Sequence, residues 1–169
     1  AEARFKQEAL ATARIDNPHV VSAIDYGHLP GGGTYLVIQL VRGVSLWQKQ
    51  EAGPLPWAQV CQVGVQVADA LAAAHAAGIV HRDLKPENIL LESRADGTMH
   101  ARVVDFGLAH VSAAASKPGA AASKLTGIGA VLGTPGYMSP EQTCGEAVDE
   151  RTDLYALGVI LWECCTNCF

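Results

Sequence analysis

The clearest pattern in the chain is helical and covers residues 57–75. Apolar side chains recur there at steps of three and four residues, which places them on one face of an α-helix. They are Val60, Val63, Val67, Leu71 and Ala74. Pro56 suits the start of a helix and Gly78 suits a position just after its end. The pattern predicts a long helix with one buried face, and His75 is interpreted as a packing or capping residue.

Short apolar segments between turn residues predict two β-hairpins. In the first, residues 23–26 and 34–40 flank a turn at residues 30–33 that contains three glycines. This turn is not followed by a helix or by a Lys-Ser/Thr pair, so it predicts a flexible hairpin turn and not a phosphate-binding loop. In the second, residues 89–91 and 101–104 are joined by a connection that contains an Asp-Gly pair.

Three other segments have distinct patterns. Residues 5–15 show apolar positions near a helical period, and Pro18 would end that helix. Residues 108–132 are rich in Ala, Ser, Gly and Lys and have little periodicity, so we expect them not to become ordered by themselves. The apolar stretch at residues 154–165 contains Glu163 and is too short to span a membrane.

Composition indicates a globular protein. The 169 residues are 49% hydrophobic and 17% charged. The net charge of −5 and the lack of a basic run give no support for a nucleic-acid partner. The five cysteines come without a second Cys/His cluster, which favours reduced thiols in a cytoplasmic protein over a zinc site.

Residues 81–88 carry the candidate chemistry, in the run His-Arg-Asp-Leu-Lys-Pro-Glu-Asn. A second carboxylate, Asp105, follows Asp83 by 22 positions and begins an Asp-Phe-Gly triplet. The predicted hairpin between them would return Asp105 to the side of Asp83. A carboxylate can accept the proton of a hydroxyl, Lys85 can offset phosphate charge, and Asn and Asp oxygens suit a hard divalent cation. The set therefore favours phosphoryl transfer from a magnesium nucleotide.

With residues 133–141, Gly-Thr-Pro-Gly-Tyr-Met-Ser-Pro-Glu, these motifs make the chain resemble the eukaryotic-type protein kinases, most of all their bacterial serine/threonine branch. The resemblance implies an α+β, protein-kinase-like fold in an incomplete two-lobed domain over residues 1–169. Residues 1–41 would be the remainder of the β-rich N-lobe and the hinge, and residues 42–169 the front half of the helical C-lobe. The activation segment would cover residues 105–141, approximately.

By this resemblance, Asp83 orients the substrate hydroxyl and accepts its proton, while Lys85 approaches the γ-phosphate of ATP. Asn88 and Asp105 would hold Mg²⁺ or Mn²⁺. Ile38 would be the gatekeeper, the hinge backbone at Gln39 and Val41 would bind adenine, and Leu90 would form the floor of the adenine pocket.

Other positions match regulatory or structural residues of the family. Arg82 would pair with a phosphate on the activation loop, for which Thr126 is the preferred acceptor and Ser123 the second. Thr134 would contact the catalytic Asp and Lys, and Asp153 would bond the backbone at positions 81 and 82. The remaining positions in this class are Phe106 and Gly107, which complete the triplet begun by Asp105. His81 is interpreted as a packing residue beneath the site.

Two glutamates correspond to family residues that normally form ion pairs. Glu8 corresponds to the glutamate that pairs with an ATP-binding lysine, and Glu141 to one that pairs with an arginine. The sequence offers neither partner, nor the glycine-rich loop, and an unpaired buried carboxylate is costly. We therefore expect an excerpt of a larger kinase that is weakly active or inactive by itself.

The expected function of the parent is transfer of the ATP γ-phosphate to Ser or Thr hydroxyls of proteins. Two alternatives stay open. One is a pseudokinase or scaffold that binds partners, and the other is a small-molecule phosphotransferase of related fold. Retention of all four candidate catalytic residues disfavours the first, and the docking element at residues 133–141 disfavours the second.

Overall fold

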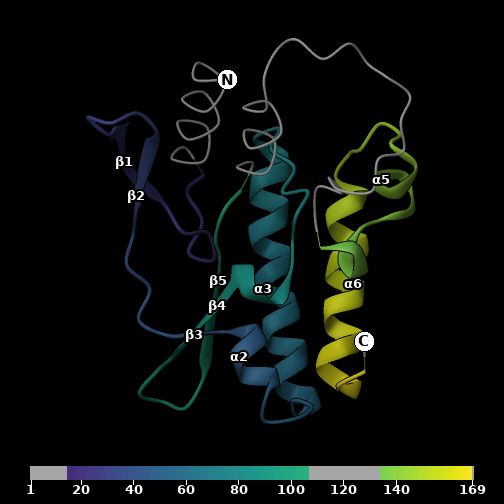
Figure 1. Cartoon of the computed structure of the whole chain (residues 1–169). Helices are drawn as coiled ribbons and strands as arrows, with labels where there is room; N and C mark the ends of the chain where they lie inside the picture. Colours follow the sequence, from purple (N-terminus) through teal and green to yellow (C-terminus); the bar gives the residue numbers. More distant parts are fainter. Residues whose placement is uncertain (1–14, 107–133, 169) are drawn as a thin grey trace.

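The structure, a computed structural model, describes residues 15–106 and 134–168 (Figure 1). The helix predicted at residues 5–15 lies outside this part of the chain except for its last residue. Glu8, Gly107, Ser123 and Thr126 also lie outside it. Within it, two small sheets and several helices give the mixed α+β content that the family resemblance implies.

The first predicted hairpin is confirmed. Strand β1 (Ala23–His28) pairs antiparallel with β2 (Thr34–Ile38), and Tyr26 lies opposite Leu36. The turn between them has positive φ angles at positions 32 and 33, which glycine tolerates because it lacks a Cβ. β2 ends two residues earlier than predicted, and most side chains of this hairpin are exposed or half-buried.

The second predicted hairpin is confirmed as part of a three-stranded sheet in the order β3-β4-β5. The strands are β3 (Val44–Ser45), β4 (Ile89–Ser93) and β5 (Met99–Val103), and both pairings are antiparallel. Gly43, just before β3, lies so close to the Leu91 carbonyl that a Cβ at this position would overlap it.

The long predicted helix is α3 (Trp57–Ala76), and all five residues of its predicted apolar face are buried. That face packs against β5 and against α6 (Arg151–Thr166), which contains the predicted apolar stretch. Gly64 on α3 lies under the Leu161 side chain of α6, where even a methyl group would be tight. These contacts form the core of the described part of the chain.

Short elements complete the fold. The helix α2 (Leu46–Gln50) begins with a capping box between Ser45 and Gln48. The motif residues lie in or next to three further short elements. These are the 3₁₀ turns η1 (Pro86–Asn88) and η2 (Pro135–Tyr137) and the helix α5 (Pro140–Cys144). No helix in residues 15–106 and 134–168 is long and apolar enough to cross a membrane.

Residues 17–21 attach alongside β5. Val20 and Val103 form a parallel bridge, and the Val103 N–H donates to the His19 carbonyl at 2.8 Å. The rings of His19 and His100 lie 4.7 Å apart, and each donates to a backbone carbonyl of the other segment. β5 is thus held on both edges, and it ends just before Asp105.

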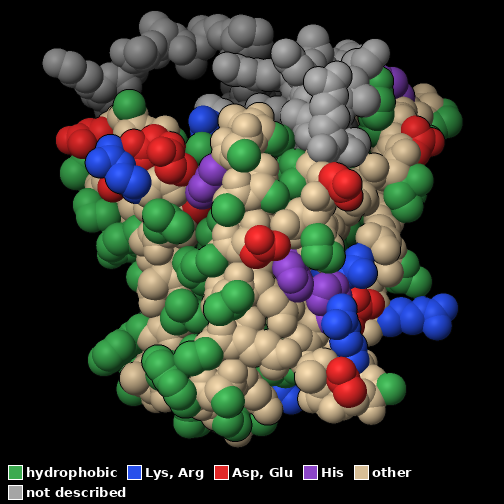
Figure 2. Space-filling model, turned by 180° about the vertical axis from the view of Figure 1, so that it is seen from behind, with side chains coloured by type: hydrophobic (Ala, Val, Ile, Leu, Met, Phe, Trp, Pro, Cys, Tyr) green, Lys and Arg blue, Asp and Glu red, His purple; other side chains and the backbone are tan. Residues whose placement is uncertain are grey.

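The face seen in Figure 2 carries exposed hydrophobic side chains scattered among charged ones.

Candidate active site

The loop from His81 to Lys85 connects α3 to η1 and is fixed from below by Asp153 on α6. The Asp153 carboxylate is 1% exposed. It accepts the backbone N–H of His81 and that of Arg82, each at 2.8 Å, and it accepts a hydrogen bond from His75 Nε2 at 2.7 Å. A helix of the core therefore sets the position of the loop backbone through one buried side chain.

Arg82 has a left-handed backbone, with φ of 69°. A residue with a Cβ adopts this conformation at a cost of about 1–3 kcal/mol unless its surroundings enforce it. Here its N–H is bound by Asp153, and its carbonyl accepts the Gln142 side-chain amide from α5 at 2.7 Å. The loop conformation is thus held from two helices, and the Gln142 contact was not foreseen from the sequence.

The His81 ring is fully buried beneath the loop, as expected of a packing residue. Its Nε2 donates to the Val104 carbonyl at 2.9 Å, and its Nδ1 accepts the Asp83 N–H at 3.3 Å. The ring also lies 4.9 Å from that of Phe106. Burial lowers the pKa of His81, so the neutral ring with a proton on Nε2 is favoured. One imidazole joins the Asp83 loop to the end of β5.

Asp83, Lys85 and Thr134 lie together at the surface of the loop. Lys85 Nζ is 3.1 Å from Asp83 Oδ2, and the two side chains are 25% and 24% exposed. Lys85 Nζ also donates to Thr134 Oγ1 at 3.5 Å. The structure thus brings residue 134 to the Asp-Lys pair from a segment 49 positions away.

Asn88 comes directly before β4 and Asp105 comes two residues after β5, so both lie at the open end of the second hairpin. The Asn88 side-chain amide donates to the Asp83 carbonyl at 2.9 Å, which directs its oxygen away from that bond. The Val104 N–H donates to the Asn88 carbonyl at 2.9 Å, so Asp105 follows directly after a residue bound to Asn88. Asp105 is exposed and has φ of 63°. The hairpin thus returns the chain at Val104 to the segment that follows Asp83.

The side-chain oxygens of Asn88 and Asp105 are donors of the kind that a hard cation such as Mg²⁺ binds. Among the described residues there is no group of three or more His, Cys, Asp or Glu side chains that could hold a metal ion. Mg²⁺ is commonly held by one or two carboxylates, with phosphate oxygens and water as its other ligands. An amide oxygen and a carboxylate beside a nucleotide fit that pattern, because the phosphates complete the shell.

The residues expected to bind adenine come from β2, the segment after it and β4. Ile38 is 40% exposed, and Leu90 is half-buried on β4. The Gln39 N–H donates to the Ser22 carbonyl at 3.0 Å, so this backbone donor is already used. The Gln39 side chain accepts a hydrogen bond from Arg102 at 2.8 Å. Val41 is half-buried just beyond these groups.

Glu141 has a neutral hydroxyl partner in the structure in place of an arginine. Its carboxylate accepts the Thr152 hydroxyl at 2.8 Å, and it is half-buried rather than enclosed. Hydrogen bonds from its own backbone N–H and from Thr152 lower the pKa of Glu141. A hydroxyl on α6 thus satisfies the carboxylate. No local pattern indicated this contact, because Thr152 lies on a different element.

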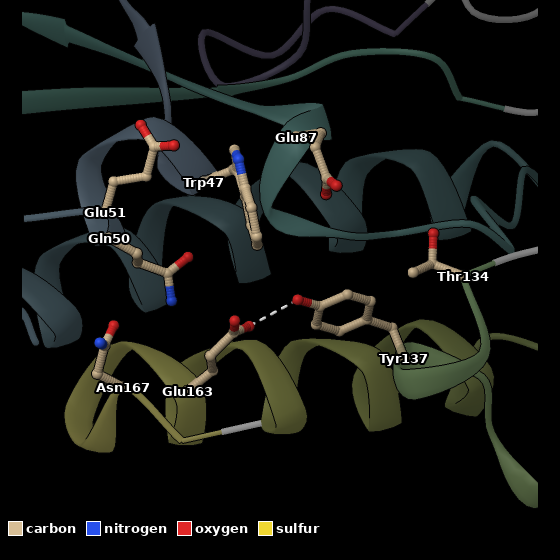
Figure 3. Close-up of a pocket in the computed structure, with 8 residues that line it drawn as sticks. All are labelled: Trp47, Gln50, Glu51, Glu87, Thr134, Tyr137, Glu163 and Asn167. Carbon is tan, nitrogen blue, oxygen red and sulfur yellow. Dashed lines mark hydrogen bonds between the residues drawn. The ribbon is translucent and has the colours of Figure 1, made fainter. Parts of the chain in front are cut away.

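A cavity of about 560 Å³ opens next to Thr134, between α2 and α6 (Figure 3). Its lining residues are Trp47, Gln50, Glu51, Glu87, Thr134, Tyr137, Glu163 and Asn167. The Tyr137 hydroxyl donates to Glu163 Oε2 at 2.7 Å, and this carboxylate is only 8% exposed. Sequence reasoning missed the cavity, although a glutamate inside an apolar helix is a signal that could have indicated it.

Comparison with known proteins shows which family the chain resembles. The family described as "Protein kinase domain" matches residues 1–169. Serine/threonine-protein kinase pkn3 of Myxococcus xanthus is 42% identical over 166 residues, which is 98% of this chain and 30% of that protein. For pkn2 of the same organism the identity is 43% over 159 residues, 94% of this chain and 18% of the relative. PknL of Mycobacterium tuberculosis is 42% identical over 165 residues, covering 97% and 38% respectively. The chain thus spans less than two fifths of each relative.

Proposed function

This chain belongs to the protein kinase domain family, and we propose that the protein containing it transfers the γ-phosphate of ATP to Ser and Thr hydroxyls of proteins. The observation that carries the proposal is the cluster of Asp83, Lys85 and Thr134 on a loop fixed from the core. Its relatives are named serine/threonine-protein kinases.

In the proposed reaction, the substrate hydroxyl oxygen forms a bond to the γ-phosphorus while the bond from that phosphorus to the bridging oxygen of ADP breaks. Asp83 accepts the hydroxyl proton, and ADP leaves with the electron pair of the broken bond. Lys85 offsets the charge of the transferred group, and its contacts to Asp83 and Thr134 hold it next to the reacting atoms. Thr134 orients Lys85 and Asp83.

Asn88 and Asp105 are proposed to hold Mg²⁺ or Mn²⁺, which when bound neutralises phosphate charge. For adenine we propose Ile38, Leu90 and the backbone at positions 39 and 41. Because the Gln39 N–H is already bound to Ser22, the contact from Gln39 would use its carbonyl oxygen, whereas Val41 would supply an N–H.

The proposed activation segment covers residues 105–141, approximately, between an N-lobe part at residues 1–41 and a C-lobe part at residues 42–169. Arg82 is proposed to bind a phosphate on Thr126. In support, Arg82 Nε is buried without a hydrogen-bond partner in the described part of the chain. Phe106 would support the site through the His81 ring, and Asp153 through the loop backbone. A cytoplasmic location is proposed from the need for ATP.

The test is transfer of radiolabelled γ-phosphate to a generic basic protein by the full-length protein, beside two variants. Asp83→Asn should abolish transfer because it removes the proton acceptor. Asp96→Asn changes an exposed carboxylate in the turn between β4 and β5 and should leave transfer unchanged. Transfer by Asp83→Asn at the wild-type rate would overturn the proposal. Mg-ATP binding without transfer would support a scaffold, and transfer to an aminoglycoside but not to protein would support a small-molecule phosphotransferase.

A further inference from the structure

Three cysteines lie within five positions at the end of α6, outside the residues of the proposed reaction. They are Cys164, Cys165 and Cys168, and all three are free thiols. Asp153, which fixes the catalytic loop, lies at the opposite end of the same helix. In Figure 1 this end of α6 lies beside the start of α3, and the Leu55 N–H donates to the Cys164 carbonyl at 2.8 Å. The proposed function makes no use of these three nucleophilic groups.

The three thiols differ in their access to solvent. Cys164 is 1% exposed and belongs to the hydrophobic core, whereas Cys165 is half-buried at the edge of the core and Cys168 is exposed. Burial raises the pKa of Cys164 to about 12, so this thiol stays protonated near neutral pH. Because the thiolate is the form that reacts with oxidants, Cys164 should be inert. Cys165 and Cys168 remain as the candidates for reaction.

The turn after α6 directs Cys168 back toward the helix. Asn167 has a left-handed backbone, with φ of 53°, and its N–H donates to the Glu163 carbonyl at 2.7 Å. A left-handed residue at this position changes the course of the chain after the helix. The Cys168 N–H then donates to Thr166 Oγ1 at 3.1 Å, and Cys168 Sγ donates to the Thr166 carbonyl at 3.5 Å. The sulfur of Cys168 therefore lies against the last turn of the helix, which also contains Cys165.

Cys165 precedes Cys168 by three positions, which is the C-x-x-C spacing of redox-active thiol pairs. In a helix, Cα atoms three residues apart are separated by about 5 Å. Disulfides join Cα atoms that are roughly 4.4–6.8 Å apart, so this spacing is within their reach. Independently of the proposed function, we propose that Cys165 and Cys168 form an oxidation site, which hydrogen peroxide converts to a reversible disulfide while Cys164 stays a thiol.

The reaction proceeds in two displacements at sulfur. The thiolate of the exposed Cys168 attacks one oxygen of hydrogen peroxide, an S–O bond forms, the O–O bond breaks, and hydroxide leaves with the electron pair and takes up the thiol proton as water. The Cys165 thiolate then attacks the sulfur of this sulfenic acid, the S–S bond forms and a second hydroxide leaves as water with the Cys165 proton. Two thiols are oxidised to one disulfide, and one peroxide is reduced to two waters.

The test is treatment of the full-length folded protein with hydrogen peroxide, followed by alkylation of the remaining thiols in urea and digestion with chymotrypsin. Cleavage after Trp162 and Phe169 releases residues 163–169, which contain all three cysteines. After oxidation, this peptide should carry one alkyl group, on Cys164, and should be lighter by two hydrogen atoms for the disulfide. Dithiothreitol should restore three alkylated thiols. The rate should rise between about pH 7 and pH 9, because the thiolate is the nucleophile.

Two variants identify the order of the steps. Cys165→Ser removes the second thiol, so dimedone, which reacts with sulfenic acids, should label Cys168. Cys168→Ser, at an exposed position, should give neither the disulfide nor a dimedone adduct on residues 163–169. Cys144→Ser is the matched control, because Cys144 is an exposed thiol at the end of α5, and it should leave formation of the disulfide unchanged.

A further comparison separates the folded structure from the spacing of the cysteines alone. In urea, where Cys164 is no longer buried, the three thiols should give a mixture of pairings, whereas the folded protein should give the pair 165–168. The same mixture from the folded protein overturns the proposal. A cross-link to the peptide containing Cys61, a disulfide between two molecules, or three unmodified thiols after peroxide treatment also overturns it. None of these results depends on phosphoryl transfer, so the proposed function is tested separately.

Discussion

Replacing Asp153 by Asn should weaken the whole loop that carries Asp83. Asp153 is buried on α6, and its two carboxylate oxygens accept separate backbone N–H groups, one from His81 and one from Arg82. Asn has nearly the same shape but only one accepting oxygen. Its NH₂ group must therefore face one of these two N–H donors, which leaves that donor buried and unpaired.

The magnitude follows from these contacts. An unpaired buried donor costs about 1–3 kcal/mol, and hydrogen bonds to a charged acceptor contribute about 1.5–3 kcal/mol each. Because the left-handed backbone at Arg82 also depends on Asp153, we expect a loss of about 3 kcal/mol in the free energy of unfolding. With a urea m-value of roughly 2 kcal/mol/M, the unfolding midpoint should fall by about 1.5 M.

The assay is urea unfolding followed by circular dichroism, with Asp149→Asn as the matched control. Asp149 also makes a 2.7 Å ion pair, with Arg151, but the two side chains are 42% and 81% exposed, so its replacement should leave the midpoint unchanged. His75→Phe removes only one of the three bonds to Asp153 and should cost about 1 kcal/mol. A loss below about 0.5 kcal/mol for Asp153→Asn would refute the reasoning.

Three further predictions concern stability. Burial lowers the pKa values of His81 and His100 from the ordinary 6.5, so as the pH falls the unfolded chain binds protons before the folded chain does. The free energy of unfolding should therefore decrease as the pH drops below 6.5. A urea midpoint that is constant from about pH 7 to pH 5 would contradict this. Gly43→Ala should prevent β3 from pairing with β4 because the new Cβ would overlap the Leu91 carbonyl, whereas alanine at the exposed Gly31 should be tolerated in the same thermal melt. Thr152→Val should cost about 1–2 kcal/mol in urea unfolding, because this buried hydroxyl bonds two other side chains, and an unchanged midpoint would show that those bonds contribute nothing.

The sequence predicted the local elements well because their signals are local. The apolar face of α3 follows from a period of 3.6 residues, and all five of its predicted members are buried. Both hairpins follow from apolar segments separated by turn residues, and they differ from the prediction only at strand ends. The run at residues 81–88 likewise indicated much of the chemistry, because three of the four candidate catalytic side chains lie within eight consecutive positions.

The tertiary structure decided what those residues contact. Asp153 reaches His81 across 72 positions, Gln142 reaches Arg82 across 60, and the hydroxyl of Thr152 bonds the Glu141 carboxylate from α6. Gln50 is a polar residue that no sequence pattern singled out, yet it is only 5% exposed at the end of α2. Periodicity and motif spacing report which side chains share a face or a loop. Burial and hydrogen-bond partners depend on which distant elements meet, because desolvation and pairing are properties of the assembled surface.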